Sequence, residues 1–113
     1  MPVGTLVFGD TVSGTLTTAS CLLADETYAD VWTMVVLVTP TTLLMDLGSA
    51  AFDAVLFVRD SEGRLVVTDD DSGPDLDSRI THTFGAGTYR VYANTYDRSE
   101  IGAYTLSASV VTP

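Results

Sequence analysis

Aspartates gather around a predicted hairpin in the middle of the chain, where they could bind a divalent cation. Pairing Arg59 with Arg64 across the turn at 60–63 would set Asp53 opposite Asp70, or one residue away from it if Gly63 forms a bulge. Directly opposed like charges destabilise a strand pair, so a compensating group is expected. Calcium fits because it takes about six to eight hard oxygen ligands in flexible geometry. The carboxylates on offer are Asp53, Asp69, Asp70, Asp71, Asp75 and Asp77.

The same aspartates also have a purely structural interpretation. The stretch 69–75 is typical of a solvated turn, and aspartates at strand ends commonly accept hydrogen bonds from backbone N–H groups. The run also lacks the fixed ligand spacing of an EF-hand loop. Two hypotheses therefore stay open, structural carboxylates or a calcium site formed by Asp53, Asp69, Asp70, Asp71 and Asp77.

Residues suited to catalysis are scarce, and we predict a protein that is not an enzyme. His82 is the single histidine, and no nucleophile motif accompanies it. One histidine and the distant Cys21 fall short of a zinc ligand set. Paired carboxylates could suggest a glycosidase, but the aromatic residues that would line a sugar cleft sit within strand patterns, where packing explains them.

Two further sets of residues point to roles in folding and in binding. Asp30 shares a predicted strand face with Trp32, so its carboxyl should be at least partly buried and must be paired. Alternation along 87–96 directs Arg90 and Tyr92 outward. Exposed tyrosine with arginine is typical of binding hot spots, so Arg90, Tyr92 and Tyr96 form a candidate binding surface, with an ordinary solvent-exposed face as the alternative.

Composition narrows the classes of partner. The 113 residues suit one domain, 1–113, and contain 15 acidic residues, five arginines and no lysine, for a net charge of −10. This charge repels phosphate backbones and anionic lipids, so we expect no nucleic-acid partner. No apolar run nears the roughly 20 residues of a membrane span, and a secretory signal is not recognisable at the N-terminus. If Met1 is the native start, we expect the protein to stay in the cell, to leave by another route or to be carried in an assembly.

Alternation of apolar and polar residues with a period of two predicts an all-β fold. We expect strands at 3–8, 11–17, 28–38, 41–48, 53–59, 64–69, 79–84, 87–94 and 102–111, separated by turn residues such as those at 60–63 and 85–87. Eight or nine short strands with this spacing favour an antiparallel β-sandwich of jelly-roll type.

The segment 18–27 is the least strand-like part of the chain. We predict a loop with one helical turn, with Cys21 half-buried at its edge or at a strand end. Leu22 and Leu23 should either cap one end of the core or, if exposed, mark a contact surface.

Seven short phrases, in order along residues 9–110, resemble the bacterial pre-peptidase C-terminal domain. They are Gly-Asp-Thr-Val-Ser-Gly-Thr-Leu at 9–16, Tyr-Ala-Asp-Val-Trp at 28–32, Phe-Asp-Ala-Val-Leu-Phe-Val-Arg-Asp at 52–60, Thr-Asp-Asp-Asp-Ser at 68–72, Asp-Ser-Arg-Ile at 77–80, Ala-Gly-Thr-Tyr-Arg-Val at 86–91 and Gly-Ala-Tyr-Thr-Leu at 102–106. The family is similar to the collagen-binding domain of clostridial collagenases, which uses aromatic residues on a sheet face. It usually carries asparagine at the position of Asp69, and the extra charge here favours a cation.

The resemblance implies a β-sandwich that serves as an accessory module of a secreted, extracellular protein. Such a module aids secretion, stability or attachment to a protein or polysaccharide surface. The alternative is a structural or decorating subunit of a filament, a virion surface or a secreted layer, with sister subunits as partners. Terminal strands rich in valine and threonine, which could pair with neighbouring subunits, favour this alternative.

Overall fold

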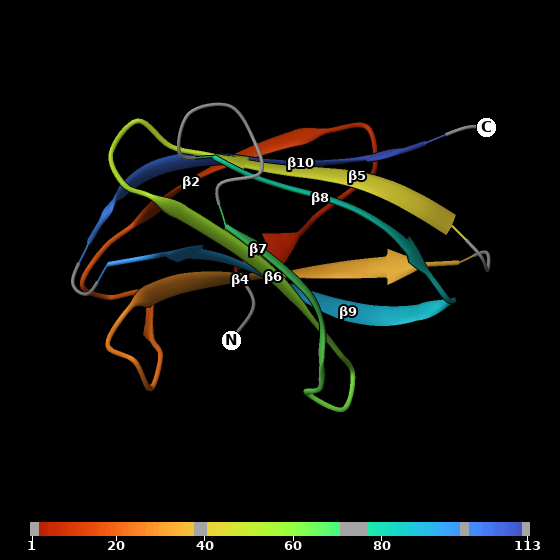
Figure 1. The fold of residues 1–113 in the computed structure, drawn as a ribbon, viewed down its shortest axis with the longest axis horizontal. Helices are drawn as coiled ribbons and strands as arrows, with labels where there is room; N and C mark the ends of the chain where they lie inside the picture. Colours follow the sequence, from red (N-terminus) through yellow and green to blue (C-terminus); the bar gives the residue numbers. More distant parts are fainter. Residues whose placement is uncertain (1–2, 38–40, 71–76, 98–99, 112–113) are drawn as a thin grey trace.

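Ten short strands stack in two layers in the described part of the chain (Figure 1). The computed structural model describes residues 3–37, 41–70, 77–97 and 100–111. Sheet A contains β1 (Gly4–Thr5), β3 (Cys21–Leu22), β4 (Tyr28–Val36), β6 (Ala54–Asp60), β7 (Leu65–Asp70) and β9 (Gly87–Thr95). Sheet B contains β2 (Thr11–Leu16), β5 (Thr41–Gly48), β8 (Ser78–Phe84) and β10 (Gly102–Val110).

The order of strands brings distant parts of the chain together. Sheet A runs β1-β4-β9-β6-β7, with β3 also paired to β4, and sheet B runs β2-β10-β5-β8. Every pairing is antiparallel except that of β1 with β4, which is parallel. The strands β9 and β6, which are separated by two other strands in the sequence, are therefore neighbours inside sheet A.

Apolar side chains from both sheets fill the space between the layers. The largest fully buried ones are Phe84, Leu6, Leu16, Met34, Leu43, Met45, Leu47, Leu56, Leu106, Val36, Val58 and Val91. Apart from Leu6, which follows β1, they come from alternate positions of their strands, as expected for two sheets that pack face to face. This shared core fixes which face of each strand points outward.

The predicted all-β sandwich is confirmed. Within the described ranges there are ten strands rather than eight or nine, because β3, two residues long, was not foreseen, and sheet A is mixed rather than fully antiparallel. Val38, placed in a strand by the sequence, lies outside these ranges. No described segment forms a helix that is long and apolar enough to cross a bilayer.

The predicted register of the β6–β7 hairpin is wrong, because the strands are shifted by two residues where a bulge at Gly63 would allow one. Asp70 lies opposite Val55, not Asp53, and Leu65 lies opposite Arg59. One residue of the shift comes from the turn, where Gly63 adopts a left-handed backbone with φ of 81°. The second comes from a bulge, since Val58 faces Val67 while the next residue of β6 faces Leu65.

The segment 18–27 also differs from its prediction. It contains the strand β3 and no helical turn. Cys21 is exposed rather than half-buried, because β3 is a short edge strand whose two residues both lie at the surface. Leu22 is 57% exposed and Leu23 is half-buried, and neither belongs to the buried core.

Candidate ligand-binding surface

The outer face of sheet A carries two neighbouring cross-strand pairs from β6 and β9. Phe57 lies opposite Tyr92, and two positions along, Arg59 lies opposite Arg90. Residues directly opposite in an antiparallel pair point to the same face, as do residues two apart on one strand. Since Val58 and Val91 between them are fully buried, all four side chains belong to the outward face.

The two aromatic rings are stacked and covered by an arginine. The ring centroids of Phe57 and Tyr92 are 4.4 Å apart, with an interplanar angle of 12°. The Cζ atom of Arg59 lies 5.4 Å from the Phe57 centroid and 5.8 Å from the Tyr92 centroid, within the range of cation–π attraction. Its Nη1 donates a hydrogen bond of 2.9 Å to the carbonyl oxygen of Gly63, which fixes the guanidinium over the rings.

The predicted outward orientation of Arg90 and Tyr92 is confirmed, since Arg90 is exposed and Tyr92 half-buried. Tyr96 follows β9 and is 63% exposed. Their binding role stays a prediction. Phe57 and Arg59 were not foreseen as part of this surface, although their spacing along β6 is a signal that could have placed them there. Only the pairing of β6 with β9 shows that they join Tyr92 and Arg90.

Two of the candidate calcium ligands, Asp69 and Asp77, hold backbone groups. Oδ2 of Asp69 accepts the N–H of Arg79 at 2.9 Å, which ties β7 in sheet A to β8 in sheet B. Oδ1 of Asp77 accepts the N–H of Ser49 at 3.2 Å. Asp53 precedes β6, and its carbonyl oxygen accepts the N–H of Tyr96. These contacts fit the structural hypothesis for Asp69 and Asp77.

A calcium site is not assembled by the described part of the chain. There, no three histidine, cysteine, aspartate or glutamate side chains lie close enough to hold a metal ion. Asp71 and Asp75 fall outside the described residues, and the side chain of Asp70 is not described. The calcium hypothesis therefore stays a prediction about the segment 70–75.

Asp30 is buried and paired, as expected, but its partner is a tyrosine. The Tyr104 hydroxyl donates a hydrogen bond of 2.6 Å to Oδ2 of Asp30, and accepts one of 3.0 Å from Nε1 of Trp32. Tyr104 belongs to β10 and the other two residues to β4, so these bonds join sheet B to sheet A. Burial, and secondly the bond to Asp30, raise the pKa of Tyr104 far above its ordinary value. The network acts as a structural lock.

His82 lies in β8, the edge strand of sheet B, within the strand expected at 79–84. Its ring packs edge-on against Phe84, with 4.8 Å between the centroids. This aromatic contact gives the imidazole a packing role.

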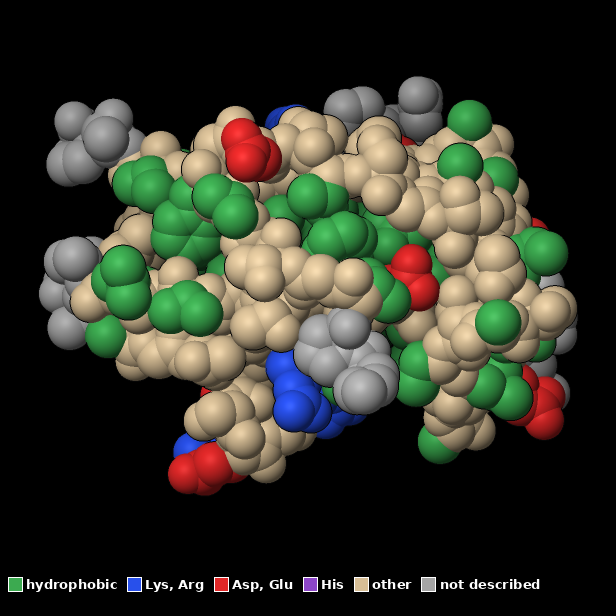
Figure 2. All heavy atoms as spheres, turned by 180° about the vertical axis from the view of Figure 1, so that it is seen from behind, with side chains coloured by type: hydrophobic (Ala, Val, Ile, Leu, Met, Phe, Trp, Pro, Cys, Tyr) green, Lys and Arg blue, Asp and Glu red, His purple; other side chains and the backbone are tan. Residues whose placement is uncertain are grey.

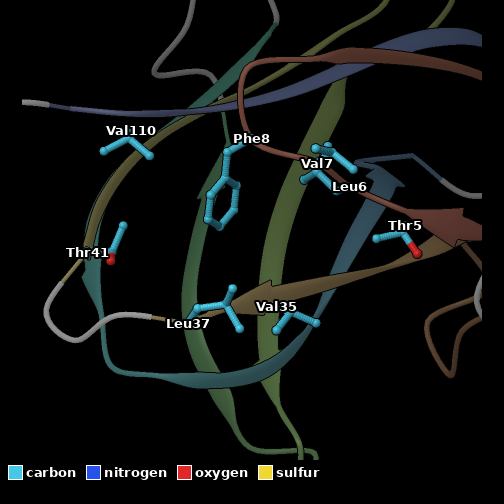
Figure 3. Close-up of a pocket in the computed structure, with 8 residues that line it drawn as sticks. All are labelled: Thr5, Leu6, Val7, Phe8, Val35, Leu37, Thr41 and Val110. Atoms are coloured by element: carbon cyan, nitrogen blue, oxygen red, sulfur yellow. The ribbon is translucent and has the colours of Figure 1, made fainter.

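An apolar cavity of about 470 Å³ opens at one end of the sandwich (Figure 3). It is lined by Thr5, Leu6, Val7, Phe8, Val35, Leu37, Thr41 and Val110, none of which is charged. Figure 3 shows Phe8 and Leu37 pointing toward each other from opposite sides. Four of the lining residues, Val7, Val35, Leu37 and Val110, are at least 44% exposed, so apolar side chains concentrate at this end.

Comparison with known proteins identifies the fold. No family model matches the chain, and no curated protein matches it. Among solved structures, the pre-peptidase C-terminal domain of collagenase from Bacillus anthracis is similar, with a TM-score of 0.68 and 18% sequence identity. The similarity covers 96% of this chain and 97% of that one. The resemblance seen in the sequence is thus confirmed as a common fold.

Proposed function

We propose that this chain, which has the fold of the pre-peptidase C-terminal domain, is a non-catalytic accessory module. In this proposal it belongs to a secreted bacterial protein and attaches it to a protein or polysaccharide surface. The main support is the exposed Arg90 with the half-buried Arg59 and Tyr92 on the outer face of sheet A, above the buried ring of Phe57. Aromatic and arginine side chains concentrated on one face are typical of recognition surfaces.

The geometry of this face suits binding rather than chemistry. Arg59 is fixed by its bond to Gly63 and by the two rings, so its side chain loses little further freedom when a ligand arrives. The scaffold below it is rigid, since β9 and β6 are both paired on each side. A preformed surface of this kind, spread over the face of a sheet, suits an extended partner.

Co-sedimentation with insoluble matrices tests the proposal. Collagen fibrils, chitin, cellulose, peptidoglycan and immobilised pectate, an acidic polysaccharide, are incubated with the wild-type protein and with Tyr92→Ala. We expect one matrix to retain the wild type and to release the variant. His82→Ala, an aromatic side chain in the other sheet, is the matched control and should be retained.

Tyr96→Ala asks whether the surface extends past the end of β9, as the sequence predicted. Thermal unfolding of each variant verifies that it is folded. The proposal is wrong if no matrix retains the wild type, or if Tyr92→Ala and His82→Ala behave alike.

A specific observation also favours the second candidate, a subunit of an assembly. The residues that line the apolar end, among them Val7, Leu37 and Val110, carry no charge, so copies of a chain with net charge −10 could meet there with little local repulsion. Size-exclusion chromatography with light scattering tests this candidate. It predicts an oligomer that Leu37→Glu dissociates, and a wild-type monomer at all concentrations would contradict it.

A further inference from the structure

Two arginines face each other on a protein that is otherwise strongly acidic. Arg59 and Arg90 are directly opposite on β6 and β9, although like charges in this position destabilise a strand pair. The chain has only five basic residues against 15 acidic ones. Figure 2 shows arginine side chains gathered beside the hairpin that protrudes at the bottom of the view. Two neighbouring arginines are unusual on the surface of a chain whose net charge is −10.

The two arginines differ from the other described ones in their surroundings. Arg64 forms ion pairs with Asp60 and Glu62, and Arg79 forms one with Asp46. Within the described residues, no carboxylate lies within ion-pair distance of Arg59 or Arg90. Arg59 uses one N–H for the Gly63 carbonyl, and a guanidinium has five such donors in a planar fork. The pair therefore offers donors for an anionic group from outside.

We propose that Arg59 and Arg90 bind the carboxylate or sulfate groups of an acidic polysaccharide. This inference rests on the proposed function and names the class of ligand for the same face. A guanidinium matches both anions, because its fork forms two parallel hydrogen bonds with either. An anion between the two side chains also offsets the repulsion between them.

A sugar chain fits this face better than an acidic peptide does. Peptides that join a sheet do so along an edge with unpaired backbone groups, but β9 and β6 are both interior strands. Recognition must therefore come from side chains. Thr33 lies opposite Arg90 and Thr68 lies opposite Phe57, which adds hydroxyl groups on both sides of the arginines.

A shallow trough continues the same surface. It has a volume of about 440 Å³, and its lining combines the apolar side chains of Leu23, Val55 and Phe57 with the polar ones of Asp25, Arg59, Thr68 and Asn94. The trough therefore offers apolar contacts together with hydrogen-bonding groups, and the Asp25 carboxylate, which accepts two hydrogen bonds from Thr27, would repel an anion placed beside it. A few sugar units can lie along it with an anionic group at the arginines.

The net negative charge of the protein favours short acidic ligands over long ones. Nucleic acids need several basic contacts along the phosphate backbone, whereas two arginines suffice for one or two sugar carboxylates. The surrounding negative field opposes long polyanions, so a short oligosaccharide is the suitable probe. Added salt should weaken binding, because the attraction is electrostatic and the arginines are at the surface.

Isothermal titration calorimetry with defined oligomers tests the proposal. The probes are hexagalacturonate, a sulfated heparin-derived hexasaccharide, and methyl-esterified hexagalacturonate as the neutral control. We expect one or both anionic probes to bind and the ester not to. Arg59→Gln and Arg90→Gln should each weaken binding by at least about tenfold, since each removes a charge-assisted contact.

Arg79→Gln is the matched control, because it removes the same charge from sheet B and should leave the affinity unchanged. Arg59→Gln also removes the contact of the guanidinium with the two aromatic rings, which could disturb the fold locally. Arg90→Gln keeps the test valid in that case, since Arg90 is exposed and its replacement should leave the fold intact. Equal affinity for the ester, equal loss in Arg79→Gln, or no binding of either anionic probe would overturn the proposal.

Two outcomes separate this inference from the proposed function. Tighter binding of oligoglutamate than of both sugars would replace the polysaccharide with an acidic protein segment and refute the inference. Retention on a neutral matrix that depends on Tyr92, without binding of any anionic oligomer, would also refute it. The accessory-module proposal would stand in both cases.

Discussion

Removing one hydroxyl, in Tyr104→Phe, should destabilise the protein more than any other change of a single atom that we consider. The hydroxyl is the link between Asp30 and Trp32, and the Tyr104 side chain is almost fully buried, at 3% exposure. The ring of the variant fits the same space. The effect therefore isolates the two hydrogen bonds.

The size of the loss follows from these bonds. A hydrogen bond to a charged group contributes about 1.5–3 kcal/mol, and a buried polar group left without its partner costs about 1–3 kcal/mol. Because some relaxation and entry of water offset these terms, we expect a loss of about 2–4 kcal/mol. At about 2.1 cal/mol/K per residue, the unfolding entropy of 113 residues is about 0.24 kcal/mol/K. The melting temperature should then fall by about 8–17 °C.

Thermal and urea unfolding, followed by circular dichroism, measure this effect. Tyr89→Phe is the matched control, because the Tyr89 hydroxyl also donates one hydrogen bond, to the carbonyl oxygen of Gly85, but at an exposed site. Its loss should be below about 1 kcal/mol. Similar losses in the two variants would refute the view that the bonds of Tyr104 lock the sheets together.

Three further predictions concern pH, steric fit and calcium. Because the pKa of Tyr104 is raised in the folded state, the unfolded chain loses the tyrosine proton at lower pH than the folded chain does. The stability that this group contributes is therefore complete below about pH 10, and above it falls by up to about 1.4 kcal/mol per pH unit. Urea unfolding measured at a series of pH values should show a smaller decline in Tyr104→Phe than in the wild type. A Cβ atom at Gly14 would overlap the Tyr104 hydroxyl and ring, so Gly14→Ala should lower the melting temperature, whereas Gly9→Ala meets no atom within 4 Å and suffers only from its positive φ. Calcium at millimolar concentration should raise the melting temperature relative to a chelator control, and an unchanged midpoint would leave the aspartates of 69–71 with structural roles alone.

Strand positions could be predicted from the sequence because a sheet with one buried face imposes a period of two. The expected strands at 41–48 and 87–94 match β5 and β9 to within one residue. The same alternation placed Arg90 and Tyr92 on the outward face. The short strand β3 was missed, since two exposed residues carry no such pattern.

Contacts between strands could not be predicted in the same way. The register of the β6–β7 hairpin depends on the left-handed backbone of Gly63 and on the bulge after Val58, and neither follows from alternation. The partner of Asp30 lies 74 residues away in the other sheet. The group formed by Arg59 and its neighbours likewise depends on the pairing of β6 with β9, which are not consecutive in the chain.

The central claim is that the outer face of sheet A binds the ligand, and two-dimensional NMR tests this claim most directly. Backbone amide and arginine side-chain signals are recorded while hexagalacturonate is added. The account predicts that the largest changes fall on Arg59, Arg90, Tyr92 and the adjacent positions of β6 and β9. Changes centred on Val7 and Leu37 at the apolar end, or no changes at all, would contradict it.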